Sequence, residues 1–524
     1  MNYPYHLNQT IVCFCFLLLT FSIGCNQHGK NRQDKNTPQN YFVRATDSDA
    51  VDESNVQIVH SIKSLQSIRF QAGDTIFFQG GQVFEGTIQL LLKGAPEDPI
   101  VLLSKGRGKA IIDGKNNEAL KLQGHNFQVK NLQLIGAGRK NGNITNGFIL
   151  DGAHDVWIDS IQISGFQKSG LAVLNSFNVL IRNVHAMGNG AIGISMDHSK
   201  NAVIQDCLAE DNPGDPTNLT NHSGNGILVG NSKNVLIDHC VATNNGWDMP
   251  RVGNGPVGIW TYQSDSIIIQ YCISYKNKTS EGGKDGGGFD FDGGVSNSIM
   301  QYCLSYENEG AGYGLFQYSG ADNWSNNIIR YCLSIDDGAK TEGAGGIFLW
   351  NGGASSSELT NAFIHNNVVV NQHKPCVVFE PASKNENVLL ANNLFIGKQE
   401  LVSGPTSGEK FIGNVYWRLD DQAISFRGFK SLKDWAESTK QEKWNGKLVG
   451  KVLNPRLKGP LTIKTTDPYQ LDQLTAYQLQ EPSPLKDSGI NLEKIGVINL
   501  PPTDFYGNPI TDRNSTEPGI YEIN

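Results

Sequence analysis

Asp290 and Asp292 are the residues whose types and spacing point most directly to chemistry. They stand one residue apart in the segment GGGFDFDGG at positions 286–294. Alternate residues of a β-strand face the same side about 6.5 Å apart, so a strand would present both carboxyl groups together. Inverting glycoside hydrolases use two carboxyl groups about 6.5–9.5 Å apart, one as acid and one as base. The pair therefore predicts acid–base catalysis, with inverting hydrolysis as one candidate reaction.

Aromatic residues flank this pair at equivalent positions of neighbouring segments. A glycine opens each segment, the first and third residues after it are mostly aliphatic or Phe, and the second and fourth are expected to face outward. The outward positions include Trp260, Tyr262, Phe316, Tyr318 and Trp350. Exposed rings in a stripe usually mark a binding surface, and flat rings beside carboxylates suit sugars. We interpret the stripe as a sugar-binding groove; the alternative is a small core covered by the chain's own loops.

Longer loops precede several of the opening glycines, and loops on a rigid scaffold concentrate functional residues. They carry His222, Asp248, Arg251, Lys284 and Asp285. His222 is the best single candidate for general acid or base, because the ordinary pKa of histidine is about 6.5. The alternative is a surface histidine bonded to its own turn. Arg251 and Lys284 are cations for a sugar carboxylate or sulfate, and Asp248 and Asp285 are expected at the rim of the groove.

A second candidate reaction is β-elimination on a uronic acid. His222 would act as base or acid, Tyr262 or Tyr318 would assist, and Arg251 or Lys284 would hold the uronate. Departure of a sugar would make the enzyme a polysaccharide lyase, and departure of a hydroxyl group would make it a dehydratase. A third interpretation is a glycan-binding protein without catalysis, which predicts no convergent acids or histidine.

Metals and partners are less constrained by the sequence. Asp285, Asp290 and Asp292 could hold Ca²⁺, which takes clustered oxygen ligands, but no spacing demands a metal and no cofactor is required. The net charge of −8 argues against a nucleic-acid partner, which needs a concentrated basic face. The expected partner is an acidic oligosaccharide, and the chain is expected to be a monomer.

A column of cysteines indicates which elements position these residues. Cys207, Cys240, Cys272, Cys303 and Cys332 are 29 to 33 residues apart, each in the same local pattern. The same position holds aliphatic residues before the column and asparagines after it: Leu132, Ile161, Val184, Asn367, Asn393 and Asn414. Repeats of this period with short strands and Gly/Asn turns predict a parallel β-helix of about eleven coils. The cysteines are expected to be small buried apolar filling, although disulfides between adjacent coils are geometrically possible.

The two ends of the chain differ from this pattern. Residues 11–23 are apolar and too few to span a membrane, so residues 1–24 are expected to be a signal peptide. FSIGC resembles a bacterial lipoprotein signal, which implies lipidation of Cys25. Residues 25–55 are polar and are expected to be a flexible tether. The domain is expected over 56–524, with coils at about 75–418, a short helix at 431–437 and a closing segment at about 419–524.

Several motifs resemble a known enzyme group. AGDTIFFQGG (72–81) resembles the entry coil of secreted right-handed β-helix enzymes that act on polysaccharides, and YQLQEPSPLKDSG, DFYGNP and PGIYE resemble their closing segment. With HSGNGILVG, DGGGFDFDGG and IRYCLSIDDG, the chain is most similar to the oligosaccharide dehydratases of bacterial ulvan-degradation systems. The resemblance implies elimination of water from a uronic acid at an oligosaccharide end, giving a 4,5-unsaturated sugar. It also implies the envelope of a Gram-negative bacterium, in the periplasm or on the outer membrane, with contact to the membrane only through a lipid anchor. Hydrolysis by Asp290 and Asp292 remains the alternative.

Overall fold

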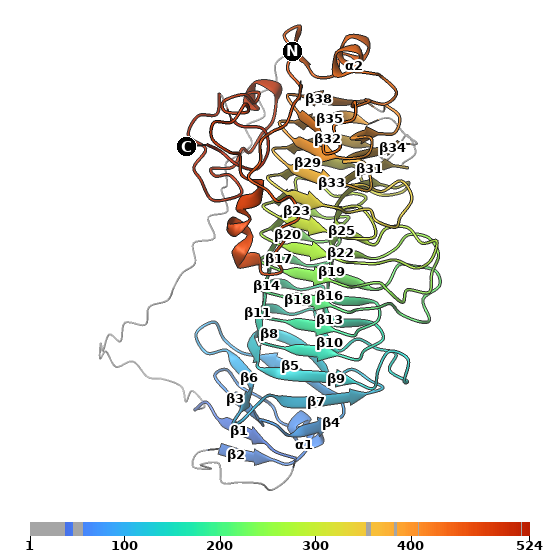
Figure 1. The fold of residues 1–524 in the computed structure, drawn as a ribbon. Helices are drawn as coiled ribbons and strands as arrows, with labels where there is room; N and C mark the ends of the chain where they lie inside the picture. The colour runs from blue at the N-terminus through green and yellow to red at the C-terminus, as the bar shows by residue number, and fades with distance from the viewer. Residues whose placement is uncertain are drawn as a thin grey trace, which may run out of the picture. The chain divides into compact units, whose positions relative to one another are not determined.

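Coils of short parallel strands make up the part of the chain that the structure describes. The computed structural model describes residues 37–45, 56–352, 358–381, 385–406, 408–514 and 516–523. Residues 38–524 form one compact unit in which the strands stack coil upon coil (Figure 1). The prediction of an all-β parallel β-helix is therefore confirmed. Among the described residues, no helix is long and apolar enough to cross a membrane.

Each central coil contributes three strands, and each strand pairs in parallel with its equivalent one coil later. One coil comprises β13 (Ser169–Leu174), β14 (Phe177–Arg182) and β15 (His185–Met187), and the next comprises β16 (Ile192–Asp197), β17 (Lys200–Gln205) and β18 (Leu208–Glu210). The corners are sharp because residues such as Asn175 and Asn183 take left-handed backbone angles, with φ of 50° and 52°. Asparagine tolerates this conformation better than most residues, which explains its abundance at the corners.

Three parallel sheets result from this stacking. The first contains β5 (Ile88–Lys93), β10 (Phe148–Asp151), β13, β16, β19 (Asn225–Gly230), β22 (Val257–Tyr262), β25 (Gly287–Phe291), β28 (Tyr313–Gln317), β31 (Ile347–Asn351), β34 (Val377–Pro381) and β37 (Val402–Ser403). The second contains β3 (Thr75–Gln79), β6 (Ile100–Lys105), β11 (His154–Asp159), β14, β17, β20 (Lys233–Asp238), β23 (Asp265–Gln270), β26 (Ile299–Gln301), β29 (Trp324–Arg330), β32 (Leu359–His365), β35 (Glu386–Ala391) and β38 (Glu409–Ile412). The long strand β8 (Leu120–Lys130) pairs with members of both and joins them.

The third sheet forms the remaining wall and extends beyond the coils counted from the sequence. It contains β4 (Val83–Glu85), β7 (Ala110–Lys115), β9 (Leu132–Gly136), β12 (Gln162–Ser164), β15, β18, β21 (Val241–Thr243), β24 (Ile273–Tyr275), β27 (Leu304–Tyr306), β30 (Leu333–Ile335), β33 (Val368–Asn371), β36 (Leu394–Gly397), β39 (Val415–Arg418) and β42 (Lys451–Val452). The strands β4 and β7 precede the column that begins at Leu132, because these early coils lack the repeated local pattern.

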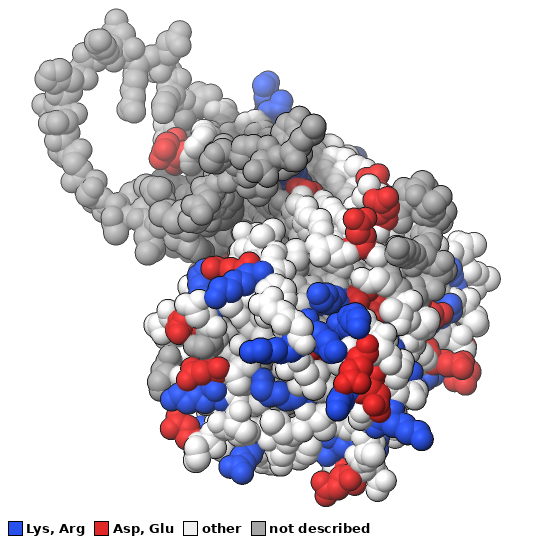
Figure 2. All heavy atoms as spheres, turned by 90° about the horizontal axis from the view of Figure 1, so that it is seen from above, with Lys and Arg blue, Asp and Glu red and all other residues white. Residues whose placement is uncertain are grey.

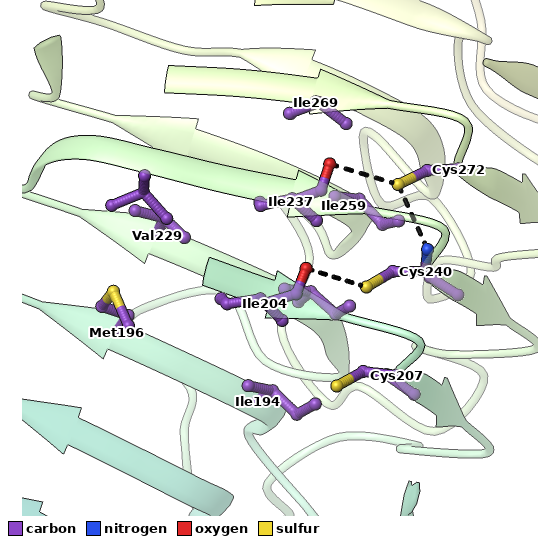
Figure 3. Close-up of a cluster of buried hydrophobic side chains, with 14 of the residues drawn as sticks. Ile194, Met196, Ile204, Cys207, Val229, Ile237, Cys240, Ile259, Ile269 and Cys272 are labelled. Carbon is purple, nitrogen blue, oxygen red and sulfur yellow. Dashed lines mark hydrogen bonds between the residues drawn. The ribbon is translucent and has the colours of Figure 1, made fainter. Parts of the chain in front are cut away.

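The cysteine column lies inside the coils, just before the strands of the third sheet. The backbone N–H of the residue after each cysteine bonds to the carbonyl oxygen of the cysteine one coil earlier, so Val241 bonds to Cys207 and Ile273 to Cys240. The thiols are buried and free, and Cys240 Sγ lies 3.4 Å from the carbonyl oxygen of Ile204 (Figure 3). Apolar side chains of the first and second sheets surround them. The prediction of buried filling is confirmed, and the disulfide alternative is not realised among the described cysteines.

A ladder of buried asparagines follows the cysteines at each coil. The Nδ2 atom of Asn212 donates to Oδ1 of Asn245 at 2.9 Å, and the pattern continues through Asn277 and Asn308 to Asp337. Each of these amides also donates to a carbonyl oxygen of the preceding coil or to a nearby serine. Because every rung bonds to the next, the coils are held in register at this corner.

The ordered chain begins earlier than the sequence suggested. Strand β1 (Asn40–Val43) lies within the predicted tether over 25–55, yet it pairs with β2 (Val56–Val59) and with β3. The side chains of Phe42 and Val43 are fully buried. The predicted start of the domain at residue 56 is therefore corrected to the strand β1. Although polar residues flank it, the segment NYFV is apolar enough to cover the first coil together with α1 (Ile62–Gln66). The expected signal peptide and the lipidation of Cys25 lie outside the described residues.

The C-terminal part closes one end of the stack and then covers the third sheet. Helix α2 (Leu432–Thr439), which confirms the predicted helix at 431–437, places Trp435 5.2 Å from Phe411 and stacks it on Phe426. The small hairpin of β40 (Lys443–Trp444) and β41 (Lys447–Leu448) follows. The last segment then runs back along the coils, and Tyr469 bonds to Asp206. Seen from above, Lys and Arg lie interspersed with Asp and Glu (Figure 2).

Candidate active site

The outer face of the first sheet brings the chemically interesting residues into neighbouring coils. In β25 the side chains of Phe289 and Phe291 are buried in the core, so Asp290 points away from it. The register places Asp290 beside Trp260 of β22 and beside Gly314 of β28. The alternation predicted from the opening glycines is therefore realised at this strand, and Asp292 follows directly after its end.

Asp290 is the least solvated carboxyl group of the site. Its side chain is 3% exposed, and its Oδ1 atom has no hydrogen-bond partner among the described residues. Burial raises its pKa well above the usual range, and the charges of Asp292 and Asp285 raise it further. Gly314 makes room for this oxygen, since a Cβ atom there would lie 2.9 Å from Oδ1. Burial and the neighbouring charges therefore favour the protonated form of this carboxyl group.

Asp292 and Asp285 are the second and third carboxyl groups of the cluster. Burial and the charge of Asp285 raise the pKa of Asp292 to about 7, although Oδ1 of Asp292 accepts a bond from the N–H of Gly293. Burial raises the pKa of Asp285 to about 6, although a 2.7 Å hydrogen bond from the N–H of Gly255 and the charge of Lys284 favour its ionised form. Three neighbouring carboxyl groups thus differ in proton affinity, as an acid and a base must.

His222 lies at this site as well. Burial and the nearby Arg251 lower its pKa to about 4, so the imidazole is neutral at pH 7. Asn225 Oδ1 accepts bonds from the N–H groups of Val257 and Trp260, which orients the amide, and its Nδ2 then donates to Nδ1 of His222 at 3.0 Å. The histidine proton therefore sits on Nε2. In this arrangement His222 is a neutral hydrogen-bond donor, and its role as acid or base stays a prediction.

Trp260 is covered by the chain itself. Its side chain is 4% exposed, packs with Leu228 and Val257, and meets the ring of His222 edge-on at 4.9 Å. Its expected place on an open sugar-binding surface is corrected, because the loop that carries His222 folds over it. At this coil the alternative of a small covered core holds.

The other aromatic residues of the stripe are partly exposed. Phe316 meets Phe348 at 5.3 Å and Trp350 at 6.4 Å, both edge-on. Burial, together with the charges of the nearby Asp292 and Tyr262, raises the pKa of the Tyr318 phenol to about 12. Burial and the charge of Asp197 also raise the pKa of Tyr262. Both phenols are neutral donors at pH 7, and together with Phe316 and Trp350 they line the open side of the carboxyl cluster.

The charged residues of the rim divide into two groups. Arg251 is half-buried, donates to the carbonyl oxygen of Asn254 at 3.2 Å, and influences the pKa of both His222 and Asp285, so its charge faces the site. Lys284 is exposed on the same rim. Asp248 is instead paired with two cations.

Asp248 forms ion pairs with Arg139 and Lys140, which hold the pKa of its carboxyl group below the usual range. Arg139 also donates to the carbonyl oxygen of Gly214 at 3.0 Å. These bonds tie together three loops, so Asp248 holds the rim in place instead of offering a free carboxylate to a ligand. Its predicted role in substrate binding is corrected accordingly.

Asn225 is a site residue that the sequence did not single out. It orients His222, Trp260 and the start of β22 at once. The available signal was its place directly before the opening glycine Gly226, where other coils carry varied residues. Within the described residues, no three His, Cys, Asp or Glu side chains form a group that could hold a metal ion. The Ca²⁺ site at Asp285, Asp290 and Asp292 therefore stays a sequence prediction.

The arrangement can perform acid–base chemistry on a polar ligand. Asp290 can give a proton, Asp292 titrates near neutrality and can take one, and His222, Tyr262 and Tyr318 can donate hydrogen bonds. Arg251 and Lys284 supply positive charge at the rim for a negatively charged ligand.

Several solved structures are similar to this chain. The lacto-N-biosidase GH136 of Eubacterium ramulus is similar over 66% of this chain and 68% of its own, with 17% identity and a TM-score of 0.49. A mannuronic acid-specific family 6 polysaccharide lyase from human gut microbiota is similar over 70% and 86%, with 14% identity and a TM-score of 0.47. An alginate lyase from Paenibacillus sp. str. FPU-7 is similar over 55% and 95%, with 16% identity and a TM-score of 0.41. Similarities this low assign no activity.

No curated protein matches this chain. A family described as "Right handed beta helix region" matches residues 106–223 and 215–395, which together span more than half of the 524 residues. The match covers β7 through β35 and includes the strands that carry the carboxyl cluster. The chain therefore belongs to the right-handed beta helix family.

Proposed function

We propose that this protein is a carbohydrate-active carbon–oxygen lyase that removes water from a uronic acid at the end of an acidic oligosaccharide. The observation that carries the proposal is the pairing of Asp290, whose buried position raises its pKa and favours the protonated form, with Asp292, whose pKa is about 7. Such a pair supplies one acid and one base at the same pH. The resemblance to ulvan-degrading dehydratases supports an ulvan-type substrate.

In the proposed reaction the Asp292 carboxylate takes the proton from C5 of the uronic acid. The electron pair of the C5–H bond forms the C4–C5 double bond while the bond between C4 and its hydroxyl group breaks. Asp290 gives its proton to the departing hydroxyl, which leaves as water. The net products are a 4,5-unsaturated sugar and one water molecule, and the two carboxyl groups regain their starting states by exchanging one proton with solvent.

The remaining residues of the site would bind and polarise the substrate. Arg251 and Lys284 would pair with the uronate carboxylate, whose charge grows as C5 loses its proton. His222 would donate from Nε2, and Tyr262 would donate from its phenol to sugar oxygens. Phe316, Tyr318 and Trp350 would form the apolar wall against which the sugar ring stacks, with Asp285 at the edge.

Inverting glycoside hydrolysis is the second candidate function. The observation that favours it is that Asp290 and Asp292 occupy alternate positions at one strand end, a spacing of about 6.5 Å that falls at the lower limit for an inverting pair. Asp290 would then protonate the leaving sugar, and Asp292 would activate water.

Absorbance and product mass distinguish these reactions. The full chain is incubated with uronate-containing oligosaccharides of defined length, with Asp290→Asn as the matched control. New absorbance near 235 nm with a mass loss of one water supports the dehydratase. New absorbance with chain cleavage would replace it by a polysaccharide lyase, and cleavage with gain of water and no absorbance would replace it by the hydrolase. Binding without any product would leave a glycan-binding protein.

Placement in the cell is a separate proposal. We propose that the chain is a monomeric lipoprotein of a Gram-negative envelope, in the periplasm or on the outer membrane, attached through Cys25. Mass spectrometry of the purified protein, with Cys25→Ser as control, tests this: a lipid adduct on the peptide that begins at residue 25 supports it, and an unmodified mature terminus contradicts it.

A further inference from the structure

A second concave surface lies next to the carboxyl cluster, where the first sheet turns into the second. It encloses about 590 Å³ and is formed by equivalent corners of successive coils. Its lining includes Asn175, His198, Lys200, Asn231, Lys233 and Gln263. Most of these residues follow directly after the last residue of a first-sheet strand, so the groove runs along the ends of β13, β16, β19 and β22.

This groove borders the candidate active site. Asn231, in its wall, donates from Nδ2 to Oδ1 of Asp197 at 2.8 Å and reaches the hydroxyl oxygen of Tyr262 at 3.4 Å. On the other side Gly294 lines the groove two residues after Asp292. A chain of sugars with one end at Asp292 would therefore meet this groove directly, with Tyr262 at the boundary.

The groove carries its positive charge in one place. Lys200 and Lys233 occupy equivalent positions of β17 and β20, and the register places them directly opposite each other. Equivalent positions in adjacent parallel strands lie about 4.8 Å apart, so the two stems run side by side. The ammonium of Lys200 lies 5.5 Å from the ring of Phe177 and forms no ion pair with a carboxylate of the described residues.

Lys233 has a partner within reach, which matters for the charge balance. Its ammonium lies 3.1 Å from Oδ1 of Asp265, one coil further, and both side chains are substantially exposed. An exposed pair of this kind contributes little and exchanges readily with another anion. The groove lining also includes Asp322, so its two lysines and two aspartates balance overall. Its positive charge is concentrated at the end where Lys200 and Lys233 lie side by side, since Asp265 is one coil beyond Lys233.

The floor of the groove is fixed and polar. Ser199 donates from its hydroxyl to the carbonyl oxygen of Asp197 at 3.0 Å and accepts a bond from the N–H of Ser176 at 3.1 Å. The same bond links Ser199 to Ser232 and Ser232 to Ser264. These hydroxyl groups are occupied in holding the corners together, so specificity falls to the amide and ammonium groups of the walls.

We propose that this groove binds a second anionic sugar of the same oligosaccharide, with Lys200 and Lys233 pairing with its carboxylate or sulfate. The proposal rests on the proposed function, because it assumes that a glycan occupies the carboxyl cluster. It names the substrate class more closely: a chain of at least three sugars with an anionic group beyond the reacting unit. Asn231 and Gln263 would contact the hydroxyl groups between the two anions.

Binding without turnover tests the proposal. Calorimetry is performed on the full chain carrying Asp290→Asn, with an acidic tetrasaccharide, an acidic disaccharide and a neutral tetrasaccharide. The double variant Lys200→Ala/Lys233→Ala in the same background is compared with Lys410→Ala, which removes an exposed lysine from β38 at the far end of the second sheet. We expect the double variant to weaken tetrasaccharide binding at least tenfold, to leave disaccharide binding unchanged, and Lys410→Ala to change neither.

Equal tetrasaccharide binding by the double variant, or equal binding of the neutral tetrasaccharide, would overturn the proposal. A desulfated tetrasaccharide and a carboxyl-reduced one identify which anion the lysines bind. The two proposals fail separately. Tetrasaccharide binding that depends on the lysines without any 235 nm product contradicts the dehydratase alone. Product formation by the lysine variant with an unchanged KM for the tetrasaccharide contradicts the groove alone.

Discussion

Asp290 and Asp337 are both buried aspartates, but Asp290 lies on the outer face of the first sheet, whereas Asp337 lies inside the stack after the third-sheet strand β30. Asp337 ends the asparagine ladder inside the stack, where Oδ1 accepts two bonds from Asn308 and Oδ2 accepts one from Ser334. Burial still raises its pKa to about 7. Asp290 lies on the outer face with an oxygen that no described residue satisfies. A raised pKa is thus common to both, and hydrogen-bond satisfaction separates the structural carboxyl from the candidate catalytic one.

The physical reason is that a buried polar group without partners is costly, roughly 1–3 kcal/mol or more for a charged group. Asp337 avoids this cost because the repeat places Asn308 of the neighbouring coil within hydrogen-bond distance of its carboxyl group. Asp290 does not, because the equivalent position one coil away is Gly314, which offers no side chain. A ligand at the exposed edge of the cluster could therefore form the hydrogen bond to Asp290 that the protein itself does not form.

The largest expected effect separates the two aspartates by activity. Asp290→Asn removes the proposed proton donor, so we expect kcat to fall by about 10²–10⁴, which is the usual contribution of general acid–base catalysis. The midpoint of thermal unfolding should stay the same or rise, because no satisfied bond is lost. Steady-state kinetics at 235 nm and a melting curve measure both. Full activity in a folded variant would contradict the role of Asp290.

The converse variant at the ladder should affect stability alone. Asp337→Ala leaves the backbone N–H of Asn308 and the hydroxyl group of Ser334 without their acceptor and removes one acceptor of the Asn308 amide, so we expect a loss of about 2–4 kcal/mol in the free energy of unfolding. Activity per folded molecule should remain within about twofold below the melting range. Denaturant unfolding and titration of active molecules provide the measurements. A large loss of kcat with unchanged stability would mean that the ladder and the site are not separate.

The raised pKa of Asp292 should make the stability of the protein depend on pH. An unfolded aspartate has a pKa near 4, whereas that of Asp292 is about 7 in the fold. The folded state therefore holds a proton that the unfolded state releases, so this group lowers stability progressively from about pH 4 to pH 7. Asp292→Asn should then stabilise the protein by on the order of 1–2 kcal/mol at pH 7 and not at pH 4. Melting curves of both proteins across this window test it, and a constant difference would contradict it.

The smallest effect is expected in the cysteine column. Cys272 is fully buried among apolar side chains and its thiol is free. Cys272→Ala removes one sulfur atom from a packed core, so we expect a loss of about 1 kcal/mol and unchanged kinetics. Denaturant unfolding under reducing and non-reducing conditions measures the change. A loss of activity on reduction of the unaltered protein would show that the column does more than fill space.

The repeat made the scaffold predictable. The cysteines and the asparagines five residues after them recur with nearly constant surroundings, so the stacking of coils in a parallel β-helix followed directly. The carboxyl cluster followed as well, because strand alternation decides that Asp290 faces away from Phe289 and Phe291. The strand NYFV before residue 56 was missed, since three apolar residues within a polar segment give no periodic signal.

The residues on loops were less predictable. The surroundings of His222 and Asp248, and the exposure of Trp260 on β22, depend on contacts made by loops from other coils. Trp260 is covered because the loop of His222 folds over it, and Asp248 is neutralised because Arg139 reaches across from a loop 109 residues earlier in the chain. The spacing of residues in the sequence does not predict which loops contact each other in the folded protein.

The sequence by itself determined the coil and the side of the sheet on which each strand residue lies, because these depend on periods of 2 and about 30 residues. The register between β25 and β28 was not determined in this way, since Asp290 pairs with Gly314 and not with Phe316, the residue at the equivalent position after the opening glycine. Only the tertiary structure decided which of the outward residues meet solvent, which carboxyl group finds donors, and which nitrogen of His222 holds its proton. Those properties depend on desolvation and on bonds between loops far apart in the chain. They are therefore set by the folded surroundings of a residue and not by its place in the repeat.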